Sequence, residues 1–228
     1  GCKTSKKYPP KKPQSKANPL NNYGRSKWEG ECVVRDILNK ATEGTEGAAR
    51  GRGIVVRVPL LYGEDCRDLS ESPALDMMKV FLLTAPQTNS RKKIDHWAPR
   101  FPTSVEDVAR VLNLMIDRIL SDRFPEESLS SGNTYHVASP HETTKYELMQ
   151  TQTKLLNIPA SQVEQRTVGE SSGPPKNAAP RPKCTQLDCG QTWKALGLNG
   201  ASDQFEFVSL EIGMKRALDG FPRRFVKE

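Results

Sequence analysis

The sequence predicts an α/β protein built on a doubly wound parallel sheet. Three features support this fold class: an apolar helical pattern over residues 22–39, a β-branched run bounded by glycines at residues 51–63, and a clearly capped helix from about residue 105. A helix followed by a strand that is apolar along its whole length is typical of a parallel sheet covered on both faces. The 228 residues suffice for one large domain or two small ones.

Residues 1–20 are predicted to form an extended basic loop. They contain six lysines, four prolines and no acidic residue, so they account for most of the net charge of +7. Such a segment is usually a solvated loop, and a phosphate-binding arm is the alternative. No run approaches the roughly 18 apolar residues of a membrane span. Neither a nucleic acid nor a membrane is therefore predicted as a partner.

The pattern over residues 22–39 predicts a core helix. Its apolar positions recur at helical spacing, for example at Val34 and Leu38. The run at residues 51–63, GRGIVVRVPLLYG, predicts a strand buried on both faces.

Further elements follow towards the C-terminus. Residues 76–84 favour a helix, residues 91–100 a strand or loop, residues 133–138 a short strand, residues 167–183 a mobile loop and residues 210–218 a last helix. Thr144 with Glu147 predicts a capped helix that reaches about residue 156. Thr103 or Ser104 caps the clearest helix, which we expect to bury one apolar face: Val105, Val108, Ala109, Leu112, Met115, Ile116 and Ile119.

The cysteines and histidines do not indicate a metal site. The five cysteines are odd in number and lack zinc-ligand spacing. Reduced thiols in the cytosol, or the nucleus, are the expected state. His136 lies on a short predicted strand, so we expect a buried histidine with its hydrogen bonds satisfied.

One pair of residues carries recognisable chemistry. Tyr23 and Lys27 are four residues apart on the first predicted helix, which places a phenol and an ammonium on one face. A nearby Lys⁺ favours the phenolate and lowers a tyrosine pKa, so that the tyrosine can pass a proton to a carbonyl as hydride arrives from a nicotinamide. Tyr8 and Lys12 share the spacing, but the prolines between them give no helical reason to converge.

Longer segments resemble a known family. The run NPLNNYGRSKWEGE, followed by RVPLLYG, resembles the extended short-chain dehydrogenases/reductases, notably the dTDP-4-dehydrorhamnose reductases. Within that superfamily, DHWAPRFPTSVEDVARV, TTKYELM and RPKCTQLDC are most similar to the regulatory beta subunits of methionine adenosyltransferase. The resemblance covers about residues 18–221.

The resemblance implies a Rossmann fold with a small RmlD-like substrate-binding domain, and NADP or NAD as cofactor. Tyr23 and Lys27 would touch the nicotinamide ribose, and Pro59 and Leu61 would contact the cofactor, with strand-end packing as their alternative. The domains would be residues 1–20 as a loop, 21–64 as the remainder of the Rossmann domain, and 65–228 as the substrate-binding-like part with a loop at 165–183 and a tail at 221–228.

The resemblance also implies further site residues. Asp95, His96, Trp97 and Arg100 would line a substrate cleft, with a buried hydrogen-bond network as the alternative. Arg181 would contribute to nucleotide-sugar binding or pair with Asp188. In the tail, the residues expected to contact the methionine adenosyltransferase catalytic subunit, with a frayed terminus as the alternative, are Phe221, Arg223, Arg224 and Phe225.

The sequence departs from the family at the cofactor loop. It contains no G-x-x-G-x-x-G or G-x-G-x-x-G run, although a pyrophosphate needs close backbone approach at a helix N-terminus. We therefore expect a regulatory subunit that modulates S-adenosylmethionine biosynthesis, with cofactor binding impaired or lost, rather than an enzyme. An NADPH-dependent nucleotide-sugar reductase or epimerase is the alternative, and a nonfunctional remnant is a third. We also expect an incomplete sheet with exposed apolar surface, unless a partner covers it.

Overall fold

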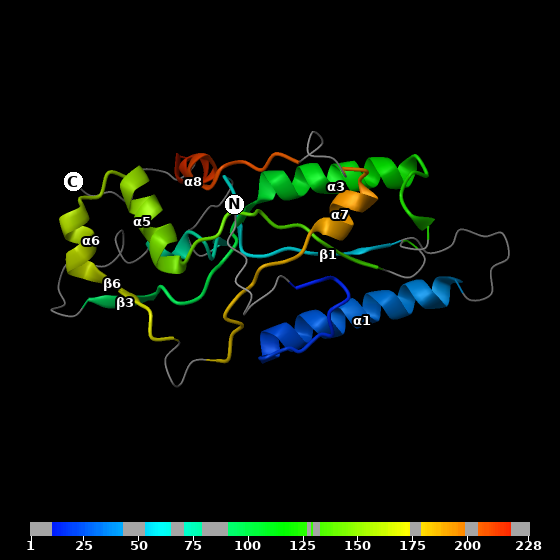
Figure 1. The fold of residues 1–228 in the computed structure, drawn as a ribbon, viewed down its shortest axis with the longest axis horizontal. Coiled ribbons are helices and arrows are strands. Elements are labelled where there is room, and N and C mark those ends of the chain that lie inside the picture. Colours follow the sequence, from blue (N-terminus) through cyan, green and yellow to red (C-terminus); the bar gives the residue numbers. More distant parts are fainter. Residues whose placement is uncertain are drawn as a thin grey trace.

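The computed structural model describes residues 11–42, 53–64, 71–78, 91–126, 129, 133–173, 179–198 and 205–219. Figure 1 shows the strand β1 (Val55–Arg57) between two long helices, with α3 (Val105–Leu120) on one side and α1 (Asn22–Thr42) on the other. This helix–strand–helix layering is the arrangement predicted for a doubly wound fold.

All three strand pairings in the described residues are parallel. β1 pairs with β5 (Thr134–His136), so that Val56 lies opposite Tyr135. β2 (Leu61–Tyr62) pairs with β4 (Thr103–Ser104), and β3 (Lys92–Asp95) pairs with β6 (Thr167–Glu170). The predicted α/β class with parallel strands is confirmed. The domain limits stay a prediction, although β5, from the range assigned to the second domain, completes the ladder of β1.

Two of the remaining helices begin and end close to the predicted positions. α5 (Lys145–Leu155) starts with the predicted capping box, in which Thr144 accepts from the backbone N–H of Glu147 and the Glu147 side chain accepts from that of Thr144. α8 (Leu210–Asp219) is the predicted last helix. Two short helices that the sequence pattern did not predict, α6 (Ala160–Arg166) and α7 (Gly190–Ala195), complete the set of α-helices with described bounds.

The core consists of separate clusters rather than one. The largest surrounds the buried face of α3, where Val111, Met115 and Tyr135 pack together. A second cluster joins Tyr62, Leu148 and residues of α8, and a small third cluster lies under β3. Among the described residues, none of the helices combines the length and hydrophobicity needed to cross a membrane. The cysteines Cys32, Cys184 and Cys189 are free thiols.

Several predictions about burial were wrong. α1 is a helix but not a core helix, because the side chains of Tyr23 and Ile37 are 73% and 61% exposed. The run at 51–63 gives two short strands, β1 and β2, rather than one strand buried on both faces. β1 is half-buried, and in β2 only Tyr62 is buried. Pro59 lies between them, and a proline has no N–H to donate to a ladder.

Two loop and helix assignments also changed. Residues 167–170, predicted as part of a mobile loop, form β6 because β3 offers a parallel partner. The helix predicted at 76–84 appears as a 3₁₀ turn, Asp76–Met78, and positions beyond 78 lie outside the described residues. On α3, Met115 and Val111 face the core whereas Val105, Ala109 and Ile116 are exposed, so the buried face is rotated from the predicted one.

Polar contacts attach α1 to the sheet. The Glu31 carboxylate accepts hydrogen bonds from Arg57 Nε and Nη2 at 2.8 and 2.7 Å. Arg35 Nη2 donates to Thr134 Oγ1 at 2.6 Å and to Glu31 at 3.1 Å. Burial opposes ionisation of Glu31, but the hydrogen bonds and charges of Arg57 and then Arg35 outweigh it and hold its pKa below the usual 4.5.

The lowered pKa of Glu31 predicts an acid-sensitive contribution to stability. A carboxylate with a lowered folded pKa adds stability above its unfolded pKa, and this contribution is lost as the pH falls through the folded pKa. At pH 7 we expect Glu31→Gln to lower the free energy of unfolding by about 1 kcal/mol, a value kept small because the group is partly solvated. Urea unfolding at pH 7 and in acid below the folded pKa checks this, because the difference between the variant and the unchanged protein should shrink in acid.

Glu29→Gln is the control, because it makes an equal change of charge at an exposed position of the same helix. A Glu31→Gln effect of equal size at both pH values would contradict the prediction.

Candidate functional site

The Tyr23–Lys27 pair lies on the first turns of α1. Asn21 precedes the helix and caps it, because its Oδ1 accepts from the backbone N–H of Gly24 at 2.9 Å. The Lys27 Nζ lies 5.5 Å from the centre of the Tyr23 ring. The predicted sharing of one helix face is therefore confirmed, and the catalytic role of the pair stays a prediction.

A hollow beside Tyr23 brings in a residue from far along the chain. Asn21 Nδ2 donates to the carbonyl of Pro180 at 2.9 Å, which holds the segment at 179–181 against the start of α1. The structure thus places Tyr23 and Arg181, both predicted site residues, at one hollow. Its lining consists of Leu20, Asn21, Asn22, Tyr23, Ala179, Pro180 and Arg181.

Arg181 belongs to a group of positive charges that we call the cationic cluster: Arg100, Lys145 and Arg181. Burial lowers the pKa of Arg100, the Asp95 charge opposes this shift, and the Arg181 charge adds to it. Burial also lowers the pKa of Lys145, and the charges of Arg181 and Arg100 lower it further. Asp95 Oδ2 lies 3.7 Å from Arg100 Nη2 and balances only part of this charge. Such a cluster suits an anionic group.

The other predicted cleft residues hold one another in place. Asp95 Oδ1 accepts from the backbone N–H of Trp97 at 2.9 Å, and His96 Nδ1 lies 2.9 Å from Thr144 Oγ1. The Nζ of Lys183 lies 5.2 Å from the centre of the Trp97 ring. Asp95, His96 and Trp97 are half-buried in these contacts, as the network alternative expects, and a substrate role for them stays a prediction.

The remaining predicted residues are not gathered at this hollow. Pro59 and Leu61 are half-buried at the break between β1 and β2 and are absent from its lining. Asp188 accepts from the N–H of Gly190 at 2.9 Å, and no contact identified in the described residues joins its side chain to Arg181. The tail residues Phe221, Arg223, Arg224 and Phe225 lie outside the described residues.

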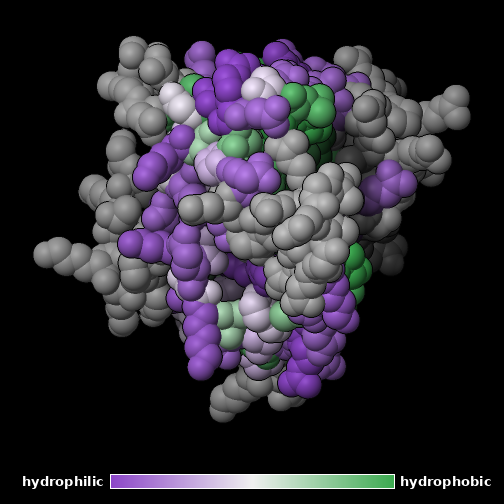
Figure 2. Space-filling view, turned by 90° about the vertical axis from the view of Figure 1, so that its right-hand side faces the viewer, coloured by the Kyte–Doolittle hydropathy of each residue, from purple (hydrophilic) through white to green (hydrophobic). Residues whose placement is uncertain are grey.

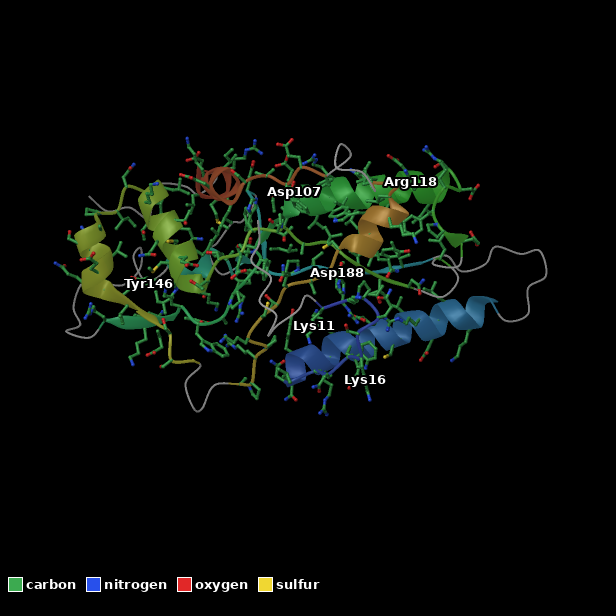
Figure 3. All side chains as sticks on the ribbon, in the orientation of Figure 1. Lys11, Lys16, Asp107, Arg118, Tyr146 and Asp188 are labelled. Atoms are coloured by element: carbon green, nitrogen blue, oxygen red, sulfur yellow. The ribbon has the colours of Figure 1, made fainter. Side chains whose placement is uncertain are left out.

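His136 corrects one expectation. It is fully buried, as predicted, but neither ring nitrogen makes a hydrogen bond of good geometry. Burial lowers its pKa, the Arg57 charge lowers it further, and backbone groups of Asp188 and Lys11 partly oppose the shift. Lys11 and Asp188 lie close together beneath α7, where the Asp188 N–H donates to the Lys11 carbonyl at 2.9 Å (Figure 3).

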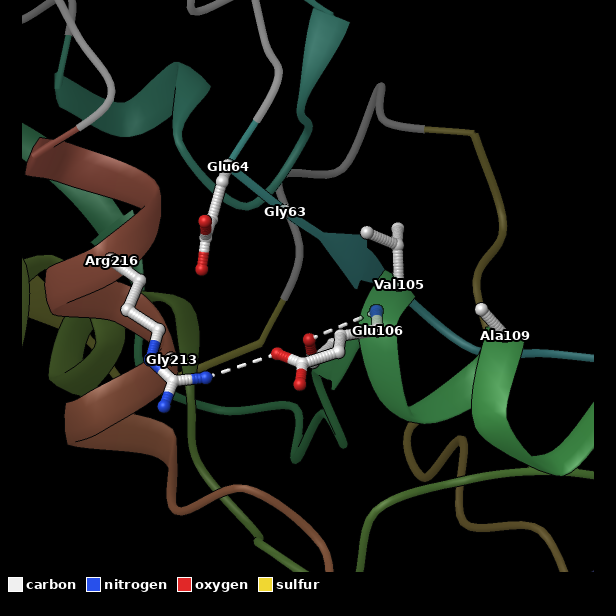
Figure 4. A pocket seen from close by; sticks show the side chains of 8 residues that line it. Gly63, Glu64, Val105, Glu106, Ala109, Gly213 and Arg216 are labelled. Carbon is white, nitrogen blue, oxygen red and sulfur yellow. Dashed lines mark hydrogen bonds and ion pairs between the residues drawn. The ribbon is translucent and has the colours of Figure 1, made fainter.

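A second hollow lies where β2 ends and α3 begins (Figure 4). Glu106 Oε2 and Arg216 Nη1 form an ion pair at 3.0 Å across it, with both side chains about half exposed. A Cβ at Gly63 would lie 2.3 Å from Val105 Cγ2, so a larger residue does not fit there. Sequence reasoning missed this hollow because no motif marks it.

Sequence reasoning also missed two lysines that lie near the predicted cleft residues. Lys145 belongs to the cationic cluster, and Lys183 lies against Trp97. Both lysines occur in segments on which the family resemblance rests, TTKYELM and RPKCTQLDC. These segments were the sequence signal by which the two lysines could have been found.

The described residues do not fit a whole dinucleotide. Tyr23 and Lys27 are free to touch a ribose, since the tyrosine is 73% exposed. The pyrophosphate, however, needs the backbone N–H groups of a glycine-rich turn, and no such run exists in the sequence. We therefore derive no step through NADP or NAD.

Comparison with known proteins supports the resemblance. The family described as RmlD substrate binding domain matches residues 3–205. The relative named methionine adenosyltransferase 2 subunit beta from Xenopus tropicalis is 37% identical over 186 residues, which are 82% of this chain and 47% of the relative. Its Bos taurus counterpart is 33% identical over 210 residues, which are 92% of this chain and 52% of the relative. The chain thus spans about half the length of these relatives.

Solved structures show the same fold at low identity. A UDP-glucose 4-epimerase with UDP-glucose from Thermotoga maritima superposes with a TM-score of 0.62 at 18% identity, covering 92% of this chain and 56% of that one. A dTDP-4-dehydrorhamnose reductase from Bacillus anthracis in complex with NADP has a TM-score of 0.56 at 21% identity, covering 91% and 58%. These likenesses confirm the predicted fold class.

Proposed function

Because the chain belongs to the RmlD substrate binding domain family, we propose that it uses this fold for binding, as a regulatory subunit of a methionine adenosyltransferase. The single observation that supports the proposal is the chain's similarity to several relatives that are all named methionine adenosyltransferase 2 subunit beta. These relatives are 31% to 37% identical to this chain over most of its length. On this proposal the chain associates with a catalytic subunit in the cytosol or nucleus and modulates S-adenosylmethionine synthesis.

The site favours binding over catalysis. A reductase would have to enclose Tyr23 and a nicotinamide together, because hydride and proton transfer need exclusion of water and fixed geometry. Tyr23 instead lies on an exposed helix face, and the chain supplies no glycine-rich turn for the pyrophosphate. The reductase alternative is supported only by distant structural neighbours, which share the fold alone.

The contact with the catalytic subunit is assigned to residues 221–228. This segment, FPRRFVKE, combines two phenylalanines with two arginines, and aromatic and arginine side chains are the commonest anchors of protein interfaces. The assignment rests on composition and on the likeness to the beta subunits.

The proposal predicts direct association with a methionine adenosyltransferase catalytic subunit. The purified chain should bind it in biolayer interferometry, and deletion of residues 221–228 should weaken binding by roughly tenfold or more, as expected for loss of an aromatic and arginine anchor. Addition of the chain should also change the rate of S-adenosylmethionine formation.

Deletion of residues 1–10 is the matched control, because it removes a basic segment of similar length from the other end. It should leave binding unchanged. Failure of the intact chain to associate would remove the proposed function. Equal binding after both deletions would remove only the role of the tail.

A further inference from the structure

A third hollow lies between α1, the paired strands β1 and β5, and the chain that leads into α1. Its lining combines residues 13–17 with Trp28 and Arg35 of α1, Arg57 of β1 and Thr134 of β5. Lys16, from the leading segment, lies beside α1 in Figure 3. The proposed regulatory function does not use this hollow, which we call the basic hollow.

The basic hollow has an excess of positive charge. Lys16, Arg35 and Arg57 are its cationic residues, and none of its described lining residues is acidic. The carboxylate of Glu31 contacts Arg57 at 2.7 Å and Arg35 at 3.1 Å. Three cations against this one carboxylate leave two positive charges unbalanced. The described residues visible in Figure 2 are mostly hydrophilic, so charge, rather than polarity, distinguishes the hollow from the rest of the surface.

The two arginines keep donors for a further anion. Arg57 uses Nε and Nη2 on Glu31, and Arg35 uses Nη2 on Glu31 and Thr134. The bonds identified in the described residues thus leave Nε and Nη1 of Arg35 and Nη1 of Arg57 for another acceptor. The Arg35 and Arg57 side chains are only 23% and 26% exposed, so solvent screens their charges less than on an open surface. Guanidinium groups in such a setting suit a phosphate.

Ser15 presents a hydroxyl at the rim of the basic hollow. It closes a turn in which its N–H donates to the Lys12 carbonyl at 3.0 Å and its Oγ accepts from the Lys12 N–H at 3.1 Å. The Gln14 side chain donates to that of Gln191 and so ties this turn to α7. Ser15 is exposed. Its hydroxyl is therefore held at the hollow and is also reachable from solvent.

The sequence around Ser15 is basic. Lys11 and Lys12 lie four and three positions before it, Lys16 follows it, and the first acidic residue of the chain is Glu29. Protein kinases select their substrates partly by the charges that flank the acceptor hydroxyl. The context of Ser15 is that of a substrate for a kinase that prefers basic segments.

Ser121 offers a contrasting case. Arg118 lies three positions before it, but its Oγ donates to the Asp117 carbonyl at 2.7 Å at the C-terminus of α3. A phosphate there would face the negative end of the helix dipole. The charges around Ser15 favour a phosphate, whereas the helix end at Ser121 opposes one.

We propose that Ser15 is phosphorylated by a serine/threonine kinase that prefers basic substrates, and that Arg35 and Arg57 receive the phosphate in the basic hollow. In the reaction Ser15 Oγ attacks the γ-phosphorus of ATP. The new bond joins Oγ to phosphorus, the bond from the γ-phosphorus to the β–γ bridging oxygen breaks, ADP leaves, and the hydroxyl proton passes to the base of the kinase. The resulting group carries close to two negative charges at neutral pH, which matches the unbalanced charge of the hollow. The proposal does not depend on the proposed regulatory function.

Treatment of the 228-residue chain with a kinase and ATP tests the modification. The probes are protein kinase C and the catalytic subunit of cAMP-dependent protein kinase, with peptide mass mapping as the measurement. We expect phosphate on Ser15, and Lys12→Gln should slow its addition by roughly tenfold, because it removes part of the basic pattern. Lys154→Gln, an exposed change of equal charge on α5, should leave the rate unchanged. Absence of phosphate on Ser15 with both kinases would overturn the proposal, as would equal rates in the two variants.

The chain with phosphoserine incorporated at position 15 during translation tests where the phosphate lies. Phosphorus NMR titration should give a second phosphate pKa about one unit lower than in the same chain unfolded in urea, because nearby positive charges favour the dianion. Arg35→Gln should remove most of this shift, and Arg35→Lys, which keeps the charge, should retain most of it.

Arg25→Gln is the matched control, because Arg25 is an exposed arginine of the same helix and is absent from the lining of the basic hollow. It should leave the shift unchanged, and circular dichroism of each variant verifies that the fold is intact. A phosphate whose pKa is the same in the folded and unfolded chains would overturn the proposal. Equal losses of the shift in Arg35→Gln and Arg25→Gln would overturn it as well.

Discussion

Replacing Met115 with alanine should lower the free energy of unfolding by about 2 to 4 kcal/mol, whereas replacing its neighbour Ile116 should change it by less than about 0.5 kcal/mol. Met115 is 1% exposed and packs in the cluster with Val111 and Tyr135, so truncation leaves a cavity. Ile116 is 50% exposed on the same helix, and alanine is the better helix former.

Urea unfolding followed by circular dichroism measures both values, and Ile116→Ala is the matched control for Met115→Ala. Comparable losses in the two variants would show that the Ile116 side chain is buried in solution, in contrast to the half-exposed position described here. If Met115→Ala lowers the free energy of unfolding only slightly, the packing of α3 described here is contradicted.

The contrast between these two residues shows which part of the fold the sequence predicts. The apolar arc of α3 is wide enough to include Met115 and Ile116, so periodicity identifies a helix with a buried side. It does not say which half of the arc meets a neighbour, because the neighbours come from distant segments. The same reasoning explains α1, which was predicted as a helix but wrongly as a core helix.

Features fixed by local chemistry were predicted well. The capping box at Thr144 and Glu147 depends on residues three apart, and the structure contains it. β6 was missed because residues 167–170 form a strand only through their pairing with β3, more than 70 positions earlier. Residue composition in that segment indicates a loop, and a tertiary partner overrides it.

In the candidate site, too, contacts between residues close in sequence were predictable and contacts between distant segments were not. Tyr23 and Lys27 meet because a helix brings positions four apart together, so their proximity was predictable. The cationic cluster unites Arg100, Lys145 and Arg181 from three separate segments. Only the resemblance pointed to Arg100 and Arg181, and nothing local marks Lys145 as their neighbour.

One substitution at two helix glycines should give opposite results. Gly213→Ala in α8 should lower the free energy of unfolding by about 1 to 2 kcal/mol, because overpacking a core outweighs the gain in helix propensity. The new Cβ would lie 2.5 Å from the hydroxyl oxygen and 2.8 Å from a ring carbon of Tyr62, which is 3% exposed and cannot move into solvent without leaving the core.

Gly30→Ala in α1 should instead raise the free energy of unfolding by about 0.5 to 1 kcal/mol, because its Cβ meets nothing within 4 Å and alanine restricts the unfolded chain. Chemical unfolding of both variants under one set of conditions makes each the control for the other. Stabilisation by Gly213→Ala would mean that Tyr62 and α8 are further apart than described. Destabilisation by Gly30→Ala would mean that the face of α1 around Gly30 is already covered in solution, because a Cβ there meets no atom within 4 Å in the structure described here.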